Sequence, residues 1–222
     1  MKLLGMAVQP GTTRRNLHRR GEALSRSHPC HVTLRVRREV PSLRSRRFVK
    51  RFERSMRRAC ERDRFRVVHY SVQHDHVHLI VEASSAHDLA CGMKSIGARL
   101  ARAVHRVFGR SGPVLWDRFH RRVLRTPREV RNAIAYVLLN ARRHAAKLGR
   151  RLDSPGPIDP ASSGRWFSGW RGAAPRAPDR PAVASPRSWL LRAGWLRHGL
   201  VSSSEVPGIR RRGAASCGTP PA

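Results

Sequence analysis

Two neighbouring runs of residues with strand character constrain the fold of this chain more than any other feature. Residues 65–73 and 76–83 are rich in β-branched and aromatic side chains, and only His74 and Asp75 separate them. Strands joined by so short a polar turn pair with each other in an antiparallel arrangement. The sequence therefore predicts a β-hairpin over residues 65–83.

The segments on either side of the hairpin carry one strand pattern and two helix patterns. Residues 30–36 alternate between apolar and polar side chains, which predicts a strand. Apolar side chains at spacings of three and four predict amphipathic helices over residues 45–62 and from Ser84 or Ser85 to near Gly109. One helix therefore precedes the hairpin and another follows it.

The last part of the pattern is a weaker strand followed by a long helix. The strand fits residues 114–126, and the four residues from Thr126 to Glu129 have the N-cap, proline and capping-box pattern with which a helix begins. This helix is predicted to run to about residue 148 and to carry Tyr136. The order β-α-β-β-α-β plus a C-terminal, tyrosine-bearing helix predicts an α+β fold, a ferredoxin-like sandwich in which helices cover one face of an antiparallel sheet.

The net charge of the chain points to a polyanionic partner. Among its 222 residues, 46 Lys and Arg stand against 14 Asp and Glu, which gives a formal net charge of +32. A surplus of this size favours nucleic acid over an acidic membrane surface. No apolar run approaches the roughly 20 residues of a membrane span. Arginines rather than a cleavage site follow the apolar N-terminus, so we expect no secretory signal and a cytoplasmic location.

The composition divides the chain into three parts. Residues 1–27 are a basic N-terminal arm, 28–149 hold nearly all of the regular patterning, and 150–222 are a basic tail rich in Pro, Gly and Ser. We predict one folded domain at 28–149 between weakly ordered basic segments. Five aromatic residues of the tail lie among arginines: Trp166, Phe167, Trp170, Trp189 and Trp195. They could stack on nucleic-acid bases or dock the tail onto the domain, and we favour docking.

The strongest candidate for chemistry is the histidine pair in the second strand of the hairpin. Alternate side chains of a strand point to the same face, so His76 and His78 lie on one side, roughly 7 Å apart, and could converge on one divalent metal ion. The alternative is a chance pattern, because the chain contains 12 His. Glu82 has the same parity and either supports the histidines as an outer partner or pairs with an arginine.

A second candidate lies in the last helix. Tyr136 and Asn140 are four residues apart and would share one face of that helix, together with Arg143. The tyrosine hydroxyl could act as a nucleophile, and the asparagine carbonyl could complete the ligand shell of a metal ion. The alternative is that Tyr136 covers the core and that Asn140 is a solvated helix residue.

Taken together, these motifs resemble the HUH single-tyrosine transposases of insertion sequences, most closely the REP-associated tyrosine transposases. The resemblance covers about residues 28–149 and rests on CHVTLRV in the first strand, HDHVHLIVEA in the histidine strand and DRFHRRVLRTPREVRNAIAYVLLNARRHA up to and through the tyrosine helix. The chain departs from the family at His74-Asp75, where relatives often have Pro-Asn, and at Ala141, where many have Pro. We interpret Asp75 as shaping the turn, the alternative being that it influences the metal.

The resemblance implies a site and a reaction. His76 and His78 would bind Mg²⁺ or Mn²⁺, Asn140 would supply the third ligand, and Tyr136 would be the nucleophile. The implied activity is cleavage and rejoining of single-stranded DNA by transesterification through a 5′-phosphotyrosine. The implied partner is single-stranded DNA with hairpin or palindromic ends in a bacterial, nucleoid-associated setting, and the tyrosine could serve its own subunit or the other subunit of a homodimer.

Three further residues are candidate DNA contacts, and two other functions stay open. Arg118 and His120 near the fourth strand could touch DNA or lie on a solvated strand edge, and Arg143 follows the tyrosine. A non-catalytic or domesticated DNA- or RNA-binding protein could use the same fold. A replication-initiator type of HUH endonuclease shares the metal and tyrosine chemistry, although a relaxase would usually carry its tyrosine before the histidine motif.

Overall fold

The sheet at the centre of the molecule has the strand order of a ferredoxin-like fold. The computed structural model describes residues 24–149, 157–172 and 180–208. Within them the sheet order is β2-β3-β4-β1-β5, and the recorded pairings between these strands are antiparallel. The predicted hairpin and the predicted α+β fold are both confirmed. The strands are β1 (Cys30–Arg35), β2 (Glu61–Arg62), β3 (Phe65–Val72), β4 (His76–Ala83) and β5 (His120–Val123).

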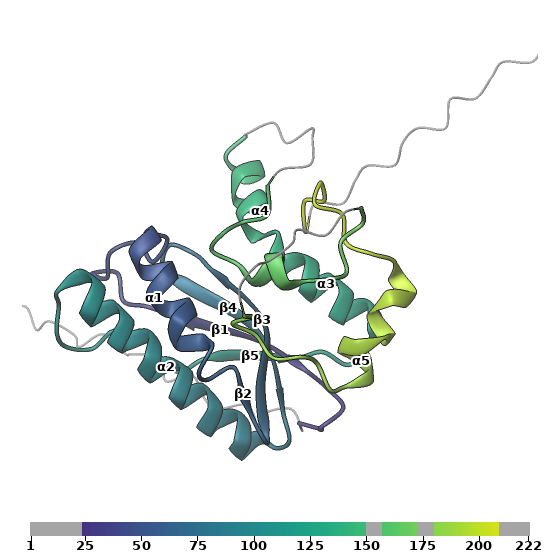
Figure 1. Ribbon diagram of the computed structural model, residues 1–222, viewed down its shortest axis with the longest axis horizontal. Helices are drawn as coiled ribbons and strands as arrows, with labels where there is room; N and C mark the ends of the chain where they lie inside the picture. The colour runs from purple at the N-terminus through teal and green to yellow at the C-terminus, as the bar shows by residue number, and fades with distance from the viewer. Residues whose placement is uncertain (1–23, 150–156, 173–179, 209–222) are drawn as a thin grey trace, which may run out of the picture.

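Two helices cover one face of this sheet, α1 (Arg46–Met56) and α2 (Ala86–Phe108) (Figure 1). Val77, Leu79 and Val81 of β4 are fully buried in the core that these helices close, as the alternation predicts. The side chain of Ser85 caps α2, which ends at Gly109 with φ 62°, a left-handed conformation that glycine adopts without strain.

The first helix is shorter than predicted, since α1 ends at Met56 rather than near residue 62. The carbonyl of Cys60 accepts a hydrogen bond from the Val67 amide at 2.7 Å, and residues 61–62 then pair with β3 as the edge strand β2. The fourth predicted strand is also shorter, because only residues 120–123 pair with β1, apart from one isolated bridge between Val36 and Leu115.

The opposite face of the sheet carries the tyrosine helix. α3 (Pro127–Leu138) begins at Thr126 with the predicted capping box. Val130, Ile134 and Val137 pack against β3 and β4 in a second hydrophobic core.

The predicted single helix from 127 to 148 is interrupted at Leu139, whose φ of −107° and ψ of 19° end α3, and α4 (Asn140–Lys147) follows. The four consecutive residues 137–140 at this junction are all buried. Tyr136 and Asn140 therefore stand on two helices instead of one face of a single helix.

Two described parts of the tail pack against α3. Phe167, Trp170 and Trp195 are buried in the second core together with α5 (Trp189–Arg192). The described part of the chain thus shows the tail docked onto the domain, which is the alternative we favour for these aromatic residues. Trp189 is the exception, because it is 51 % exposed and the guanidinium of Arg197 lies over its ring. Two short 3-10 helices complete the described tail, η1 (Ser163–Trp166) and η2 (Gly194–His198).

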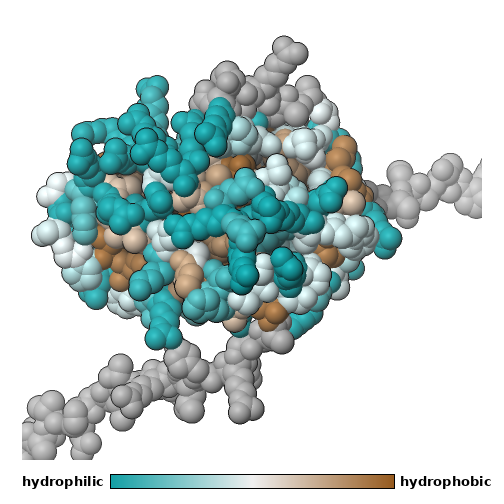
Figure 2. Space-filling view, turned by 60° about the horizontal axis from the view of Figure 1, so that its bottom comes forward, coloured by the Kyte–Doolittle hydropathy of each residue, from teal (hydrophilic) through white to brown (hydrophobic). Residues whose placement is uncertain are grey.

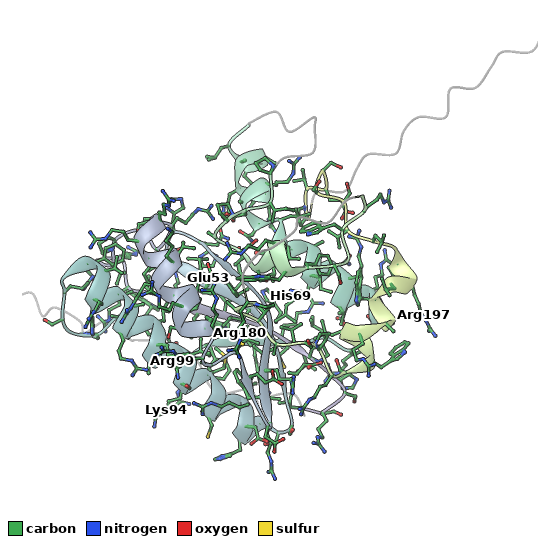
Figure 3. All side chains as sticks on the ribbon, in the orientation of Figure 1. Glu53, His69, Lys94, Arg99, Arg180 and Arg197 are labelled. Carbon is green, nitrogen blue, oxygen red and sulfur yellow. The ribbon has the colours of Figure 1, made fainter. Side chains whose placement is uncertain are left out.

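The surface is dominated by polar and charged side chains. Figure 2 shows them spread over one face with smaller hydrophobic patches between them. Lys94 and Arg99 lie on α2, whereas Arg197 lies at the opposite side of the molecule (Figure 3). Among the described residues, no helix has both the length and the hydrophobicity that crossing a membrane would require.

Candidate active site

The two histidines of β4 lie side by side on the face of the sheet that α3 covers. Their Nε2 atoms are 3.0 Å apart and their ring centroids 4.6 Å apart. Both side chains point away from the core that Val77 and Leu79 enter, so the predicted common face of the pair is observed. The neighbouring strand β1 places Arg35 opposite His76 and Thr33 opposite His78 in the register.

The other ring nitrogen of each histidine has its own partner. The Nδ1 atom of His76 lies 2.7 Å from Oδ1 of Asp75, whose Oδ2 accepts a hydrogen bond of 2.8 Å from Arg35. The Nδ1 atom of His78 lies 3.1 Å from Oγ1 of Thr33 and 3.2 Å from Nε2 of His31. Partners at Nδ1 fix the orientation of an imidazole and the direction of its Nε2 lone pair.

Three of these partners correct the sequence interpretation. Asp75 is interpreted from the sequence as shaping the turn, with an influence on the metal as the alternative, and in the structure its carboxylate contacts the imidazole of His76. Thr33 and His31 were not singled out, although alternation along β1 puts them on the same face. Only the pairing register of β1 with β4 shows that this face meets the histidine pair.

Burial keeps His78 and His31 neutral. It lowers the pKa of His78 to about 3, with further lowering by His76, His31, His144 and Arg143. It also lowers the pKa of His31 to about 4, with a smaller contribution from Arg122. Neutral imidazole is the form that binds metal ions, so His78 is in the ligand form at neutral pH.

Tyr136 lies beside this cluster. Its ring centroid is 5.1 Å from that of His78 and 5.6 Å from that of His31, both in edge-on geometry. The guanidinium carbon of Arg143 stands 4.9 Å from the tyrosine centroid. The tyrosine is partly exposed rather than enclosed in the core. The structure thus brings the predicted nucleophile and the histidine pair together within one chain.

Asn140 is the most unusual side chain in this region. It is 1 % exposed, and neither its Oδ1 nor its Nδ2 has a hydrogen-bond partner among the described residues. A buried amide without partners costs about 1–3 kcal/mol. The predicted solvated alternative for Asn140 is therefore wrong, and its amide is left unsatisfied in the interior.

The spacing of the two imidazole nitrogens fits a divalent cation. Two nitrogen ligands at right angles, each about 2.1 Å from an octahedral ion, lie about 3.0 Å apart, and the two Nε2 atoms have this separation. When Asp75 and Thr33 accept the Nδ1 protons of His76 and His78, both Nε2 atoms are unprotonated and can act as ligands. No cluster of three or more His, Cys, Asp or Glu suited to a metal occurs in the described ranges.

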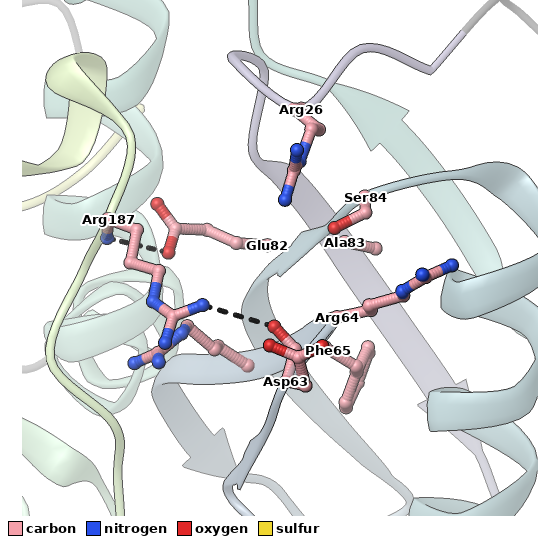
Figure 4. A pocket seen from close by; sticks show the side chains of 9 residues that line it. Arg26, Asp63, Arg64, Phe65, Glu82, Ala83, Ser84 and Arg187 are labelled. Carbon is pink, nitrogen blue, oxygen red and sulfur yellow. Dashed lines mark hydrogen bonds between the residues drawn. The ribbon is translucent and has the colours of Figure 1, made fainter.

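The remaining candidate residues divide between the site and the tail. The carboxylate of Glu82 accepts hydrogen bonds from the backbone amides of Arg187 at 2.8 Å and Ser188 at 2.7 Å (Figure 4). Of the two alternatives for Glu82, support of the histidines or pairing with an arginine, these contacts favour the second, although the donor is the backbone of Arg187 and not its guanidinium. Arg118 and His120 line a cleft of about 510 Å³ that His76 also borders.

Fold and site together define an α+β domain with a histidine pair and a tyrosine on one face of its sheet. Residues 25–122 match the family model described as "Transposase IS200 like". Over this segment the chain is similar to the IS200-like transposases, in agreement with the resemblance to the single-tyrosine transposases. The match includes His76 and His78, whereas Tyr136 and Asn140 follow it in the chain. No curated protein matches the sequence significantly.

Several solved structures resemble the chain at low sequence identity. A REP-associated tyrosine transposase bound to a REP hairpin is 18 % identical over 78 % of this chain and 99 % of its own, with a TM-score of 0.44. A transposase-like protein from Deinococcus radiodurans is 17 % identical over 57 % of this chain and 92 % of its own, with a TM-score of 0.37. A bacterial tRNA(His) guanylyltransferase-like protein in complex with ATP is 10 % identical over 61 % of this chain and 64 % of its own, with a TM-score of 0.42.

Proposed function

We propose that this protein is a DNA transposase that cuts and rejoins single-stranded DNA through a covalent bond to Tyr136. The observation that carries the proposal is the position of the Tyr136 ring, 5.1 Å from that of His78, whose Nε2 is 3.0 Å from Nε2 of His76. The family match over residues 25–122 supports the transposase class. In this proposal residues 28–149 form the catalytic unit.

The chemistry assigned to Tyr136 is a transesterification. The phenol oxygen attacks the scissile phosphorus and gives up its proton, while the bond from phosphorus to the 3′-oxygen breaks and that oxygen takes a proton. The products are a 5′-phosphotyrosine and a free 3′-OH. Because one phosphodiester replaces another, a 3′-OH can reverse the reaction and join the strand without ATP.

The residues around the tyrosine have distinct proposed roles. A divalent cation, Mg²⁺ or Mn²⁺, held by His76, His78 and Asn140 would neutralise negative charge on the scissile phosphate. Asp75 and Thr33 hold the two imidazoles in orientation through Nδ1. Arg143 places a fixed positive charge beside the tyrosine for the incoming phosphate.

The proposed substrate is single-stranded DNA with hairpin or palindromic ends, which the family resemblance implies. A net charge of +32 supports a nucleic acid as the partner. The contact between Tyr136 and His78 within one chain favours action of the tyrosine in its own subunit, with or without a homodimer. This function would place the protein at the bacterial nucleoid.

The decisive experiment compares the two tyrosines of the chain. Tyr136→Phe is expected to abolish the covalent adduct with a single-stranded oligonucleotide on a denaturing gel, while binding persists in a mobility-shift assay. Tyr70→Phe is the matched control, because Tyr70 is buried in the first core at 1 % exposure. An adduct that survives in Tyr136→Phe would refute the assignment of the nucleophile. Binding without any adduct in the unaltered protein would favour the non-catalytic alternative.

A further inference from the structure

The cleft next to His76 contains an aromatic side chain that neither core uses. Trp116 is 57 % exposed and lines the cleft of about 510 Å³ together with Arg35, Asp117 and Arg118. A single exposed tryptophan is common on protein surfaces. Its position between charged groups and beside the histidine pair is what requires an explanation.

The backbone directs this side chain to the face of the histidines. Leu115 pairs with Val36 in an isolated antiparallel bridge, and its side chain packs against the first core. The next residue, Trp116, therefore points to the other face. Its amide donates a hydrogen bond of 3.0 Å to the carbonyl of Arg35, and Arg35 lies opposite His76 in the sheet. The indole is thus presented by a fixed backbone on the side of the sheet where the chemistry lies.

Strand spacing gives the distance from the reaction centre. Residue 116 lies next to β1, and β1 lies next to the strand of His76, so their backbones are separated by two strand spacings, or about 10 Å. Nucleotides stacked in one strand advance by about 3.4 Å each. A base on Trp116 would therefore belong to a nucleotide within about three positions of a phosphate at the histidine pair.

The charges in the cleft suit a base better than a phosphate. Two arginines, Arg35 and Arg118, are balanced by two carboxylates, Asp75 and Asp117, in the lining, although the chain as a whole is strongly cationic. Arg35 is already bonded to Asp75 at 2.8 Å. A balanced set of donors and acceptors around an aromatic face matches the edges and the π-face of a nucleobase.

We propose that the Trp116 cleft is a nucleobase-binding subsite, in which one base of single-stranded DNA stacks on the indole close to the cleavage position. This inference rests on the proposed function for the identity of the strand and extends it by naming the residue that holds a base. Stacking of one base on an aromatic side chain typically contributes about 1–3 kcal/mol to binding, which corresponds to a roughly 5- to 150-fold change in affinity.

The test measures binding of a labelled single-stranded oligonucleotide in the Tyr136→Phe background, so that no covalent product forms. Trp116→Ala should weaken binding roughly 5- to 150-fold, and Trp116→Phe should retain most of the affinity. Trp189→Ala is the matched control, since Trp189 is 51 % exposed on α5 and does not line the cleft. The salt dependence of binding should keep its slope in Trp116→Ala, because no phosphate contact is removed.

Abasic substitution locates the stacked base. In protein with Trp116 intact, removal of one base should reproduce the loss of affinity, and in Trp116→Ala removal of the same base should have no further effect. Equal affinities of Trp116→Ala and Trp189→Ala, or an abasic effect that is independent of Trp116, would overturn the subsite. The proposed function fails separately: Trp116-dependent binding without any Tyr136 adduct would retain the subsite and refute the strand cleavage.

Discussion

Replacement of Asn140 with leucine is expected to stabilise the metal-free protein. The buried amide has no hydrogen-bond partner among the described residues, and an unsatisfied buried polar group costs about 1–3 kcal/mol. Leucine has a similar volume and removes this cost without leaving a large cavity. For a chain of this length, each kcal/mol shifts the Tm by about 2–4 °C. Asn140→Leu should therefore melt about 2–12 °C higher than the unaltered protein in chelator.

Addition of metal should narrow or reverse this difference in Tm. An ion that binds only the folded state stabilises it by about 2.7 kcal/mol at a concentration of 100 times its Kd. We expect Mn²⁺ to raise the Tm of the unaltered protein and to have a much smaller effect on Asn140→Leu, which lacks the amide ligand. The assay is thermal unfolding followed by circular dichroism, with and without chelator.

The control is Asn132→Leu, because Asn132 is exposed on α3. A surface change of this kind should alter stability by less than about 0.5 kcal/mol and leave the metal response intact. The reasoning would be refuted if Asn140→Leu were less stable than the unaltered protein in chelator, or if Mn²⁺ stabilised both proteins equally. The first result would mean that the amide is satisfied in solution, and the second that it is not a ligand.

Two further predictions concern individual side chains. Burial lowers the pKa of His69 from 6.5 to about 4, and His69 lies in the interior (Figure 3). Between these two pH values the unfolded chain therefore binds more protons than the folded protein. The contribution of His69 to the free energy of unfolding is fully present above pH 6.5 and is lost as the pH falls to about 4, by up to about 3 kcal/mol. In urea titrations at a series of pH values, His69→Asn should reduce the number of protons taken up on unfolding by about one, which lowers the slope of the free energy of unfolding against pH. An unchanged slope would contradict the burial argument. Asp75→Asn should weaken Mn²⁺ binding about 10- to 100-fold in calorimetry, whereas equal affinity would show that the contact with His76 does not orient the ring.

The sequence alone predicted those parts of the fold and site that depend on a single strand or on the start of a single helix. Alternation along β4 placed His76 and His78 on one face and Val77 in the core. The capping box at Thr126 gave the start of α3. These features depend on backbone periodicity and on hydrogen bonds between residues three positions apart, so they can be predicted without the tertiary structure.

Features that depend on contacts between distant segments could not be predicted in the same way. The sequence gives Thr33 and His31 the correct parity, but their contact with His78 requires the register between β1 and β4. Glu82 also has the parity of the histidines, yet its carboxylate binds backbone amides about a hundred positions later. Parity selects a face of the sheet, and only the pairing of strands and the path of the tail decide which partner a side chain meets on that face.

The interruption at Leu139 shows how such a tertiary effect shapes the site itself. A continuous helix would have placed Asn140 one turn above Tyr136, and both side chains would have faced the same way. In the structure α3 stays on the sheet, while α4 extends away from it (Figure 1). Asn140, as the first residue of α4, is then buried at the junction and its amide is left without a protein partner. The break at Leu139 thus accompanies an unsatisfied buried amide, and in the proposed function this amide is the third ligand of the metal ion.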